Sequence, residues 1–273
     1  KAVRRQRQMC IRDRHMQCNT IIERRAHKMG LMTFKGGVHP FEGKDLSKDK
    51  PIRELLPKGE LVYPLSQHIG APATPIVAVG DSVLKGQKIA EAGGFVSAPI
   101  HASVSGTVKK IEPRRVPTGD MVNSIVIESD GEFKEVEYQA VEDVSALSKE
   151  EIINRIKEAG VVGMGGAGFP THVKLSPKEP EKIDYIIANC AECEPYLTSD
   201  YRIMLDHTEE LVEGMRIILS MFEHAKGVFA VENNKPDCIA KLLELTKDEP
   251  RMEVAPLMTK YPQGGERQLI YAV

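Results

Sequence analysis

Residues 183–202 read IDYIIANCAECEPYLTSDYR, and this stretch sets the pattern of the C-terminal half of the chain. The run 183–188 is short and mostly apolar, which is typical of a strand buried on both faces of a sheet. A polar loop follows it, and residues 200–225 then have the periodicity of one long amphipathic helix. The apolar stripe of that helix comprises Leu211, Met215, Ile218 and Phe222.

The same alternation of apolar runs and amphipathic stretches continues to the end of the chain. We expect a strand over 227–231, a helix over 236–246, a strand over 252–258 and a helix that begins near residue 265. Alternating strands and helices of this size predict a three-layer α/β domain with a parallel sheet. The pattern of the last helix is still continuing at the final residue, so we expect the sequence to be a fragment.

Upstream, a helix and a glycine-rich loop precede the strand. The motif Ser148-Lys149-Glu150-Glu151 is a capping box, and Gly160 suits the helix C-terminus. The stretch VVGMGGAGFPTHVKL, residues 161–175, comes next. Its four glycines favour close approach of a ligand to the backbone, and the N–H groups of such loops can bind phosphate. These glycines are Gly163, Gly165, Gly166 and Gly168.

An aromatic ring and a cation lie beside this loop, in Phe169 and Lys174. They strengthen the prediction of a ligand site, because glycine-rich turns alone are common. The loop lacks the strand before it and the acidic residue about 20 positions later that the Rossmann fingerprint requires.

Two further turns carry candidate binding residues. Asn189, Glu192 and Glu194 follow the predicted strand 183–188, and ligands of open α/β sheets bind beyond the carboxyl ends of strands. These acids could equally be solvated loop residues. A second turn, with Tyr261, Gly264 and Glu266, again separates a strand from a helix, although a plain turn would read the same way.

Residues 60–130 have a different character, with short strands separated by glycine turns, and they predict a compact all-β unit. The sequence VAVGDSVLKGQKIAE, followed by VSAPIHASVSGTVKKI, resembles the biotinyl/lipoyl-type barrel-sandwich hybrid. In carrier members of that class a lysine at a hairpin tip is modified. The matching stretch 92–96 has no lysine, so we expect no covalent cofactor here.

The first 28 residues carry a net charge of +7, while the whole chain carries −2. We expect them to be a non-native or disordered leader, with the natural protein beginning near Met29 or Met32. The acidic remainder argues against nucleic-acid binding, which depends on phosphate neutralisation. We expect a barrel domain over 29–130, a linker over 131–147 and an α/β domain over 148–273.

The chain has no apolar run long enough to span a membrane, and its cysteines suggest no disulfide framework. Among the five cysteines, Cys190 and Cys193 form the one CxxC pair. We interpret them as small side chains packed in a tight turn and predict no metal site.

Three motifs in the same order resemble the flavoprotein subunit of respiratory complex I. GMGGAGFPTHVK matches its GRGGAGFPTGLK loop, NCAECEP matches NADEGEP, and YPQGGE stands where that protein has a YICGEE-type turn. A barrel-sandwich domain precedes these motifs, and the motif TFKGGVHP precedes that domain. In these features the chain is similar to the RnfC family of the ion-translocating Rnf complex. The likeness covers 33–273.

The resemblance implies a function. FMN and NADH would be the cofactors, and electrons would pass between NADH and ferredoxin with coupling to ion transport. The glycine loop would lie between flavin and dinucleotide, with Phe169 on the adenine and Lys174 facing the flavin phosphate. Asn189, Glu192, Glu194, Tyr261, Gly264 and Glu266 would complete the pocket, and no side chain would act as a catalytic residue.

The resemblance also implies partners and missing parts. The partners would be the other Rnf subunits, and the protein would be cytoplasmic, peripheral on the membrane. Family members have 4Fe-4S clusters in a C-terminal ferredoxin domain whose motifs this chain lacks. Departures from the complex I pattern at Met164, Cys190 and Cys193 make the site differ from its relative.

Two alternatives remain open from the sequence. One is a microcompartment cobalamin reductase, which shares the glycine loop and the domain order. The other is a scaffold subunit that docks partners without binding flavin. Flavin absorbance separates the scaffold from the enzymes, and gene neighbours separate the two enzymes.

Overall fold

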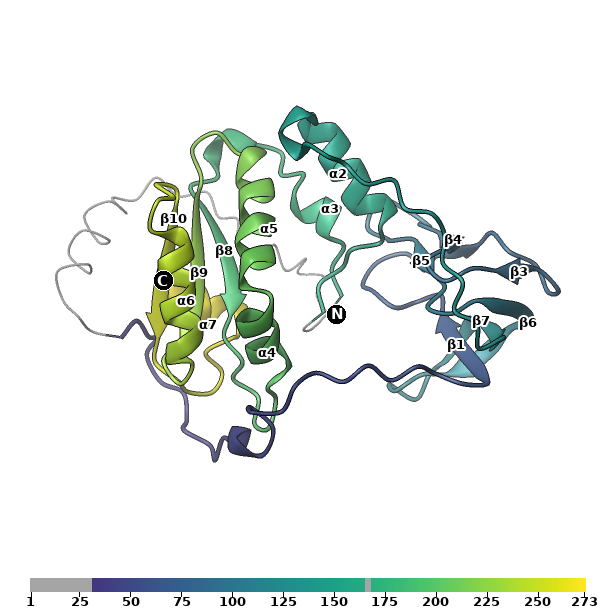
Figure 1. Cartoon of the computed structure of the whole chain (residues 1–273), viewed down its shortest axis with the longest axis horizontal. Helices are drawn as coiled ribbons and strands as arrows, with labels where there is room; N and C mark the ends of the chain where they lie inside the picture. The colour runs from purple at the N-terminus through teal and green to yellow at the C-terminus, as the bar shows by residue number, and fades with distance from the viewer. Residues whose placement is uncertain (1–30, 165–167) are drawn as a thin grey trace, which may run out of the picture. The chain divides into compact units, whose positions relative to one another are not determined.

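The computed structural model describes residues 31–164 and 168–273, which form two compact units. One unit comprises 54–177, and the other combines 31–53 with 178–273 (Figure 1). The predicted domain boundaries, with a linker at 131–147, stay a prediction. The described chain contains no helix that is long and apolar enough to cross a membrane. Cys10, Cys18 and Met29 lie outside the described residues.

The first unit is built on two small antiparallel sheets. One has the strand order β1-β7-β6-β3 and the other β2-β4-β5. The strands are β1 (Glu60–Pro64), β2 (Thr74–Pro75), β3 (Ser82–Val83), β4 (Lys88–Glu91), β5 (Ile100–His101), β6 (Gly106–Arg115) and β7 (Met121–Ser129). The predicted all-β unit over 60–130 is thereby confirmed.

Both sheets of this unit contribute to one apolar core. Ile89 of β4 and Ile125 and Ile127 of β7 are fully buried in it. The long β6–β7 hairpin requires a glycine at its start, because a Cβ on Gly106 would lie 2.0 Å from the carbonyl oxygen of Glu128. The absence of a side chain at Gly106 thus allows the two strands to approach closely.

After the barrel, the chain passes through the 3-10 turn η2 (Val144–Ala146) into helix α2 (Lys149–Glu158). The predicted capping box is present: Ser148 accepts from the backbone N–H of Glu151, whose carboxylate accepts from the N–H of Ser148. Gly160 follows the helix with a φ of 67°, a conformation that glycine adopts without strain. The glycine-rich segment then leads into the short helix α3 (Thr171–Lys174).

The second unit contains a parallel sheet with the order β10-β9-β8. It follows the 3-10 turn η3 (Pro180–Lys182). The strands are β8 (Tyr185–Cys190), β9 (Lys226–Glu232) and β10 (Met252–Leu257), and the helices are α4 (Ser199–Asp206), α5 (Thr208–Ser220), α6 (Pro236–Thr246) and α7 (Glu266–Ala272). The alternation predicted from the sequence is confirmed.

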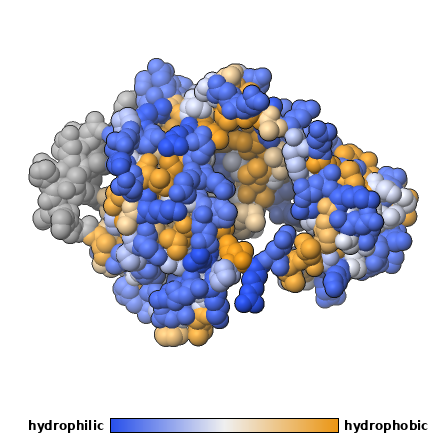
Figure 2. Space-filling view, in the orientation of Figure 1, coloured by the Kyte–Doolittle hydropathy of each residue, from blue (hydrophilic) through white to orange (hydrophobic). Residues whose placement is uncertain are grey.

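Helices cover both faces of this sheet, which gives the expected three layers. On one face, a Cβ on Gly227 of β9 would lie 2.6 Å from the sulfur of Met215 in α5. On the other, Leu269 of α7 packs in one cluster with Ala230 and Leu257 of the sheet. Figure 2 shows mainly hydrophilic residues with scattered hydrophobic ones over the outer faces of α5 and α6, as amphipathic helices require.

Two details of the prediction were wrong. The long helix over 200–225 is two helices that break at His207, whose ψ of 38° is not helical. At this break the hydroxyl of Thr208 donates to the carbonyl of Met204 and so provides a hydrogen-bond partner for the last turn of α4. The predicted apolar stripe is right at Met215 and Phe222, which are buried, and wrong at Leu211 and Ile218, which are half-buried. Their neighbours Val212 and Leu219 are buried instead.

The strand after residue 183 is likewise not buried on both faces. Within the described sheet β8 lies at the edge, and most of its residues are half-buried. The central strand β9 has every residue after Lys226 buried. An apolar run is compatible with either position, because burial depends on which strands pair.

The segment 31–53 joins the α/β unit. Met32 donates to the carbonyl of Pro256 and accepts from the N–H of Met258. Val38 exchanges backbone hydrogen bonds with Tyr261, and the chain then forms the 3-10 turn η1 (Lys44–Leu46). We call residues 39–47 the strap.

Candidate functional site

The end of β8, with the loop after it, meets the turn before α7 at the carboxyl edge of the sheet. The Nδ2 group of Asn189 donates to the carbonyl oxygen of Gly264 at 2.9 Å. A Cβ on Gly264 would lie 2.9 Å from the carbonyl oxygen of Ala191, so the two backbones approach closely where a side chain would intrude. The structure therefore brings together two of the three predicted constellations.

Glu194 and Tyr261 belong to this edge as well. Glu194 is exposed, and its carboxylate is the main cause that raises the pKa of the Tyr261 phenol. Glu266 is the first residue of α7 and half-buried, where a negative charge is favoured by the helix N-terminus. The edge thus presents carboxylates, an amide and a phenol, which suit the hydroxyls and the carboxamide of a dinucleotide.

Glu192 belongs to the loop after β8, but its side chain is buried, with only 1% of it exposed. Its Oε1 accepts from the N–H of Asp200 at 2.9 Å, and its own N–H donates to Oε2 of Glu232 at 2.9 Å. Burial raises the pKa of Glu192, and the ammonium groups of Lys44 and Lys235 oppose that shift. Its carboxylate is therefore engaged within the protein.

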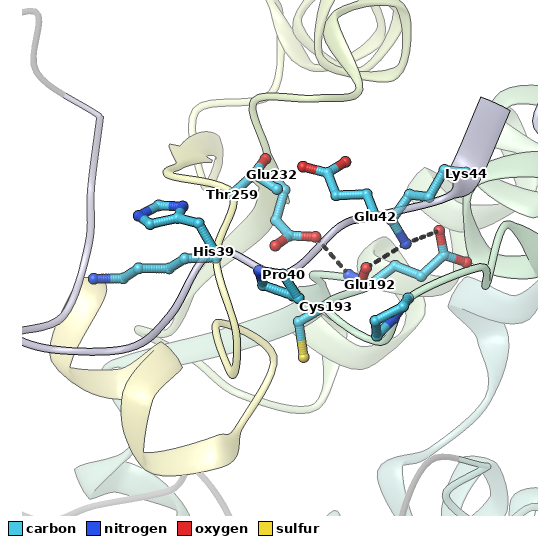
Figure 3. A pocket seen from close by; sticks show the side chains of 10 residues that line it. His39, Pro40, Glu42, Lys44, Glu192, Cys193, Glu232 and Thr259 are labelled. Atoms are coloured by element: carbon cyan, nitrogen blue, oxygen red, sulfur yellow. Dashed lines mark hydrogen bonds and ion pairs between the residues drawn. The ribbon is translucent and has the colours of Figure 1, made fainter.

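A buried charge cluster surrounds Glu192, and Figure 3 shows its members Lys44 and Glu232. Its Oε2 lies 3.5 Å from Nζ of Lys44 and 3.8 Å from Nζ of Lys235, and Lys235 is 3.3 Å from Oε2 of Glu232. The adjoining cavity measures about 30 Å³. Ligand pockets are roughly ten times larger or more, so this cavity is too small for a nucleotide. The charge cluster instead supports the loop after β8 from within the protein.

The two cysteines of the CxxC motif differ in their surroundings. Burial raises the pKa of Cys190 to about 12, and burial also raises the pKa of the half-buried Cys193. Cys193 faces the turn before α7, since a Cβ on Gly264 would lie 3.3 Å from its sulfur. Among the described residues, no group of three or more His, Cys, Asp or Glu side chains is placed to hold a metal ion.

The glycine loop lies in the first unit and is described there by itself. Gly163 donates to the carbonyl of Phe169, and Thr171 donates to the carbonyl of Val161, both at 2.9 Å. These bonds close the base of the loop as a hairpin. A Cβ on Gly163 would lie 3.4 Å from Nζ of Lys174, so an ammonium group borders backbone that carries no side chain. Gly165 and Gly166 lie outside the described residues.

The barrel supplies a neighbour to this loop that the sequence did not predict. Gly168 has a φ of 61°, and a Cβ there would lie 3.1 Å from the carbonyl oxygen of Gln67. An open hollow of about 560 Å³ lies beside them, within the size range of cofactor pockets. It is lined by Ser66, Gln67, His68, Ile69, Val162, Gly163, Met164 and Gly168.

Sequence reasoning also missed Lys44 and the barrel loop 66–69. Lys44 stands in a stretch rich in Gly, Pro and Lys without periodicity, which gives no sign of burial. The barrel loop, together with the glycine that follows it, reads SQHIG and carries a single histidine. Neither stretch has a motif whose chemistry alone marks a site.

Comparison with known families matches both halves of the chain. Residues 32–132 match the family described as the RnfC barrel sandwich hybrid domain, and residues 156–273 match the Nuo51 FMN-binding domain. The second match extends across the boundary between the compact units at residue 177, because it includes α3 and the glycine loop.

Curated relatives extend over most of the chain. It is 44% identical over 245 residues to a subunit of the Na(+)-translocating ferredoxin:NAD(+) oxidoreductase complex of Acetobacterium woodii, covering 88% of the chain and 55% of the relative. It is 45% identical over 242 residues to the corresponding subunit of the proton-translocating ferredoxin:NAD(+) oxidoreductase complex of Clostridium ljungdahlii, covering 88% and 52%. A subunit of the ion-translocating oxidoreductase complex of Haemophilus influenzae is 39% identical, with 88% and 37% covered. The chain thus spans about half the length of the first two relatives and a smaller share of the third.

Proposed function

Since this chain belongs to the RnfC family, with an RnfC barrel sandwich hybrid domain followed by a Nuo51 FMN-binding domain, we propose that it forms the flavin- and NADH-handling part of an ion-translocating oxidoreductase. Two of the three predicted ligand turns lie side by side at the carboxyl edge of the parallel sheet, tied by Asn189 and Gly264. This adjacency is the observation that carries the proposal. The expected fold, with a barrel followed by an α/β domain, is the one these families describe.

For FMN, the glycine loop with the Lys174 ammonium beside it is the candidate phosphate site. Backbone N–H groups of a glycine-rich segment can face an anion, and the Lys174 ammonium lies beside Gly163, 3.4 Å from where a Cβ would stand. We assign Gly163, Gly165, Gly166 and Gly168 to contacts with the flavin and NADH, and Lys174 to the phosphate. Bound FMN would supply hydride chemistry with NADH and one-electron chemistry with further carriers.

For NADH, the exposed acceptors at the sheet edge are the natural contacts. Glu194 and Asn189 present oxygens that can accept from ribose hydroxyls or the carboxamide, and Tyr261 and Glu266 flank them. Gly264 keeps the edge open, and Phe169 would stack on the adenine. Glu192 belongs to the same set, but its buried carboxylate supports the loop and we assign it a positioning role.

The relatives are subunits of complexes, and their names give the wider function. We propose that this protein likewise passes electrons between NADH and ferredoxin, with coupling to ion transport, in a complex with other subunits. It would lie on the cytoplasmic face of the membrane through those partners. Iron–sulfur clusters of the 4Fe-4S type would be held by parts of the intact protein that this sequence does not include.

The flavin content of the intact purified protein tests the proposal. We expect about one FMN per chain by absorbance after release. Lys174→Met should lower FMN retention severalfold, since a charge-assisted contact to phosphate is lost. Lys178→Met, which removes an exposed lysine four residues later, should retain the wild-type content. Absence of flavin from the wild-type protein, even after reconstitution with FMN, would contradict the proposal.

A further inference from the structure

Lys44 of the strap lies outside every set of residues assigned above, yet it contacts the loop after β8 at several points. Its Nζ donates to the carbonyl of Glu192 at 2.6 Å, to that of Leu197 at 2.8 Å and to that of Glu194 at 3.2 Å. Oε2 of Glu192 lies 3.5 Å away, and the lysine side chain is only 11% exposed. One ammonium group thus lies at the centre of a cradle of four oxygens, shown in part in Figure 3.

These oxygens belong to residues 192–197, so the loop curves around the charge. Three carbonyls directed at one point repel one another unless a cation lies between them. The proposed NADH contact Glu194 lies in the middle of this curved stretch, with cradle carbonyls on either side of it. The direction of its carboxylate therefore depends on the cradle.

The strap makes two further hydrogen bonds to the same loop. The N–H of Tyr196 donates to the carbonyl of Glu42 at 2.7 Å, and the hydroxyls of Ser47 and Thr198 are 2.8 Å apart. Tyr196 has a φ of 66°, which is strained for a residue with a side chain. Such a conformation persists where the surrounding contacts determine it. The loop therefore takes its shape from the strap.

The buried charges balance only when Lys44 is present. Glu192 and Glu232 are both buried, and Lys44 and Lys235 are the ammonium groups within 4 Å of them among the described residues. Without Lys44, two carboxylates share one ammonium group. An uncompensated buried charge is strongly unfavourable, so Glu192 would move toward water and the loop would change shape.

We propose that Lys44 is a positioning residue of the NADH site, acting as an internal cation that holds residues 192–197 in the form that binds the dinucleotide. This inference rests on the proposed function, because it assigns NADH to that loop. It predicts that Lys44 governs NADH affinity without governing FMN retention.

Lys44→Ala tests the inference in the intact protein, with Lys48→Ala as the matched control. Lys48 is in the same segment, and its ion pair with Asp45 is solvent-exposed. For Lys44→Ala we expect the Kd for NADH to rise about tenfold or more, as loss of charge-assisted hydrogen bonds implies, with kcat changed less than KM. FMN content should stay at the wild-type level. Lys48→Ala should match the wild type throughout.

Chemical rescue distinguishes positioning from general damage. Propylammonium ions added to Lys44→Ala should lower the Kd for NADH again, because they bring N–H donors to the cradle. Tetramethylammonium, which has no N–H group, should not. Equal recovery with both ions, or an unchanged Kd for NADH in Lys44→Ala, would overturn the inference.

Two further measurements test the inference if Lys44→Ala does not fold or if the wild-type protein does not bind NADH. If Lys44→Ala does not fold, the double variant Lys44→Ala/Glu192→Gln restores the buried charge balance and should still bind NADH about tenfold more weakly. Hydrogen exchange at the amides of 192–200 gives a readout without NADH: it should accelerate in Lys44→Ala and not in Lys48→Ala. Wild-type protein that fails to bind NADH would contradict the proposed function, while the exchange result would still decide whether Lys44 holds the loop.

Discussion

The side-chain amide of Asn189 donates a 2.9 Å hydrogen bond to the carbonyl of Gly264, a residue 75 positions later in the chain. This bond joins the end of β8, the first strand of the sheet along the chain, to the turn that follows its last strand, β10. Parallel strands bring their carboxyl ends to one edge, so residues far apart in sequence meet there. The candidate dinucleotide site is a consequence of that topology.

Removal of this bond should loosen the edge. We expect Asn189→Ala to lower the free energy of unfolding by about 1 kcal/mol, the usual net contribution of one hydrogen bond, and to weaken NADH binding. Asn189→Asp keeps the oxygen that accepts from Ala191 but loses the donor, so it should show a similar loss. Urea unfolding measures both, and stability equal to wild type in both variants would show that the bond contributes nothing.

Glu194→Gln should impair the use of NADH more than the retention of FMN. A hydrogen bond to a charged acceptor is worth roughly 1.5–3 kcal/mol, so we expect kcat/KM for NADH to fall about tenfold or more. Glu223→Gln is a suitable control, because its side chain is 83% exposed beside His224. Steady-state kinetics with an artificial acceptor provide the test, and an unchanged kcat/KM would remove Glu194 from the site.

Two glycines of the α/β unit should respond in opposite directions to alanine. In Gly227→Ala the new Cβ would meet the sulfur of Met215 at 2.6 Å, and such overpacking costs about 1–3 kcal/mol. Gly214, in the middle of α5, has nothing within 4 Å of the corresponding position. Gly214→Ala should therefore stabilise the protein by about 0.5–1 kcal/mol through helix propensity. Thermal and urea unfolding would reveal the contrast, and a stabilising Gly227→Ala would contradict the packing described here.

Cys190 should resist alkylation in the folded protein. With its pKa raised by burial to about 12, its thiolate fraction at pH 8 is on the order of 10⁻⁴, and the thiolate is the reactive form. We expect iodoacetamide at pH 8 to modify Cys193 before Cys190, since Cys193 is half-buried. Peptide mass spectrometry follows the labelling, with urea-unfolded protein as the reference. Equal rates for Cys190 in both states would show that its burial is incorrect.

The elements whose sequence signals are local were predicted well. The helix Pro236–Thr246 has a proline in its first turn and an apolar stripe, and its predicted limits are those observed. The capping box before α2 was also predicted residue by residue. In both cases neighbouring residues along the chain contain all the determining interactions.

Features that depend on long-range contacts were not predicted. The break at His207 interrupts a continuous amphipathic pattern, and the central position of β9 depends on strand order. Lys44 reaches the loop it holds across 148 positions of sequence, and nothing in its own neighbourhood indicates a cradle of carbonyl oxygens. Motifs along the chain indicate candidate site residues, whereas a residue that contacts them from another segment carries no such local signal.

Anaerobic titration of the intact, FMN-loaded protein with NADH tests the central claim most directly. The account predicts that about one equivalent of NADH bleaches the flavin absorbance, with Glu194→Gln requiring a higher concentration for the same bleaching. A protein whose bound FMN is reduced by dithionite but stays oxidised in excess NADH would contradict the account.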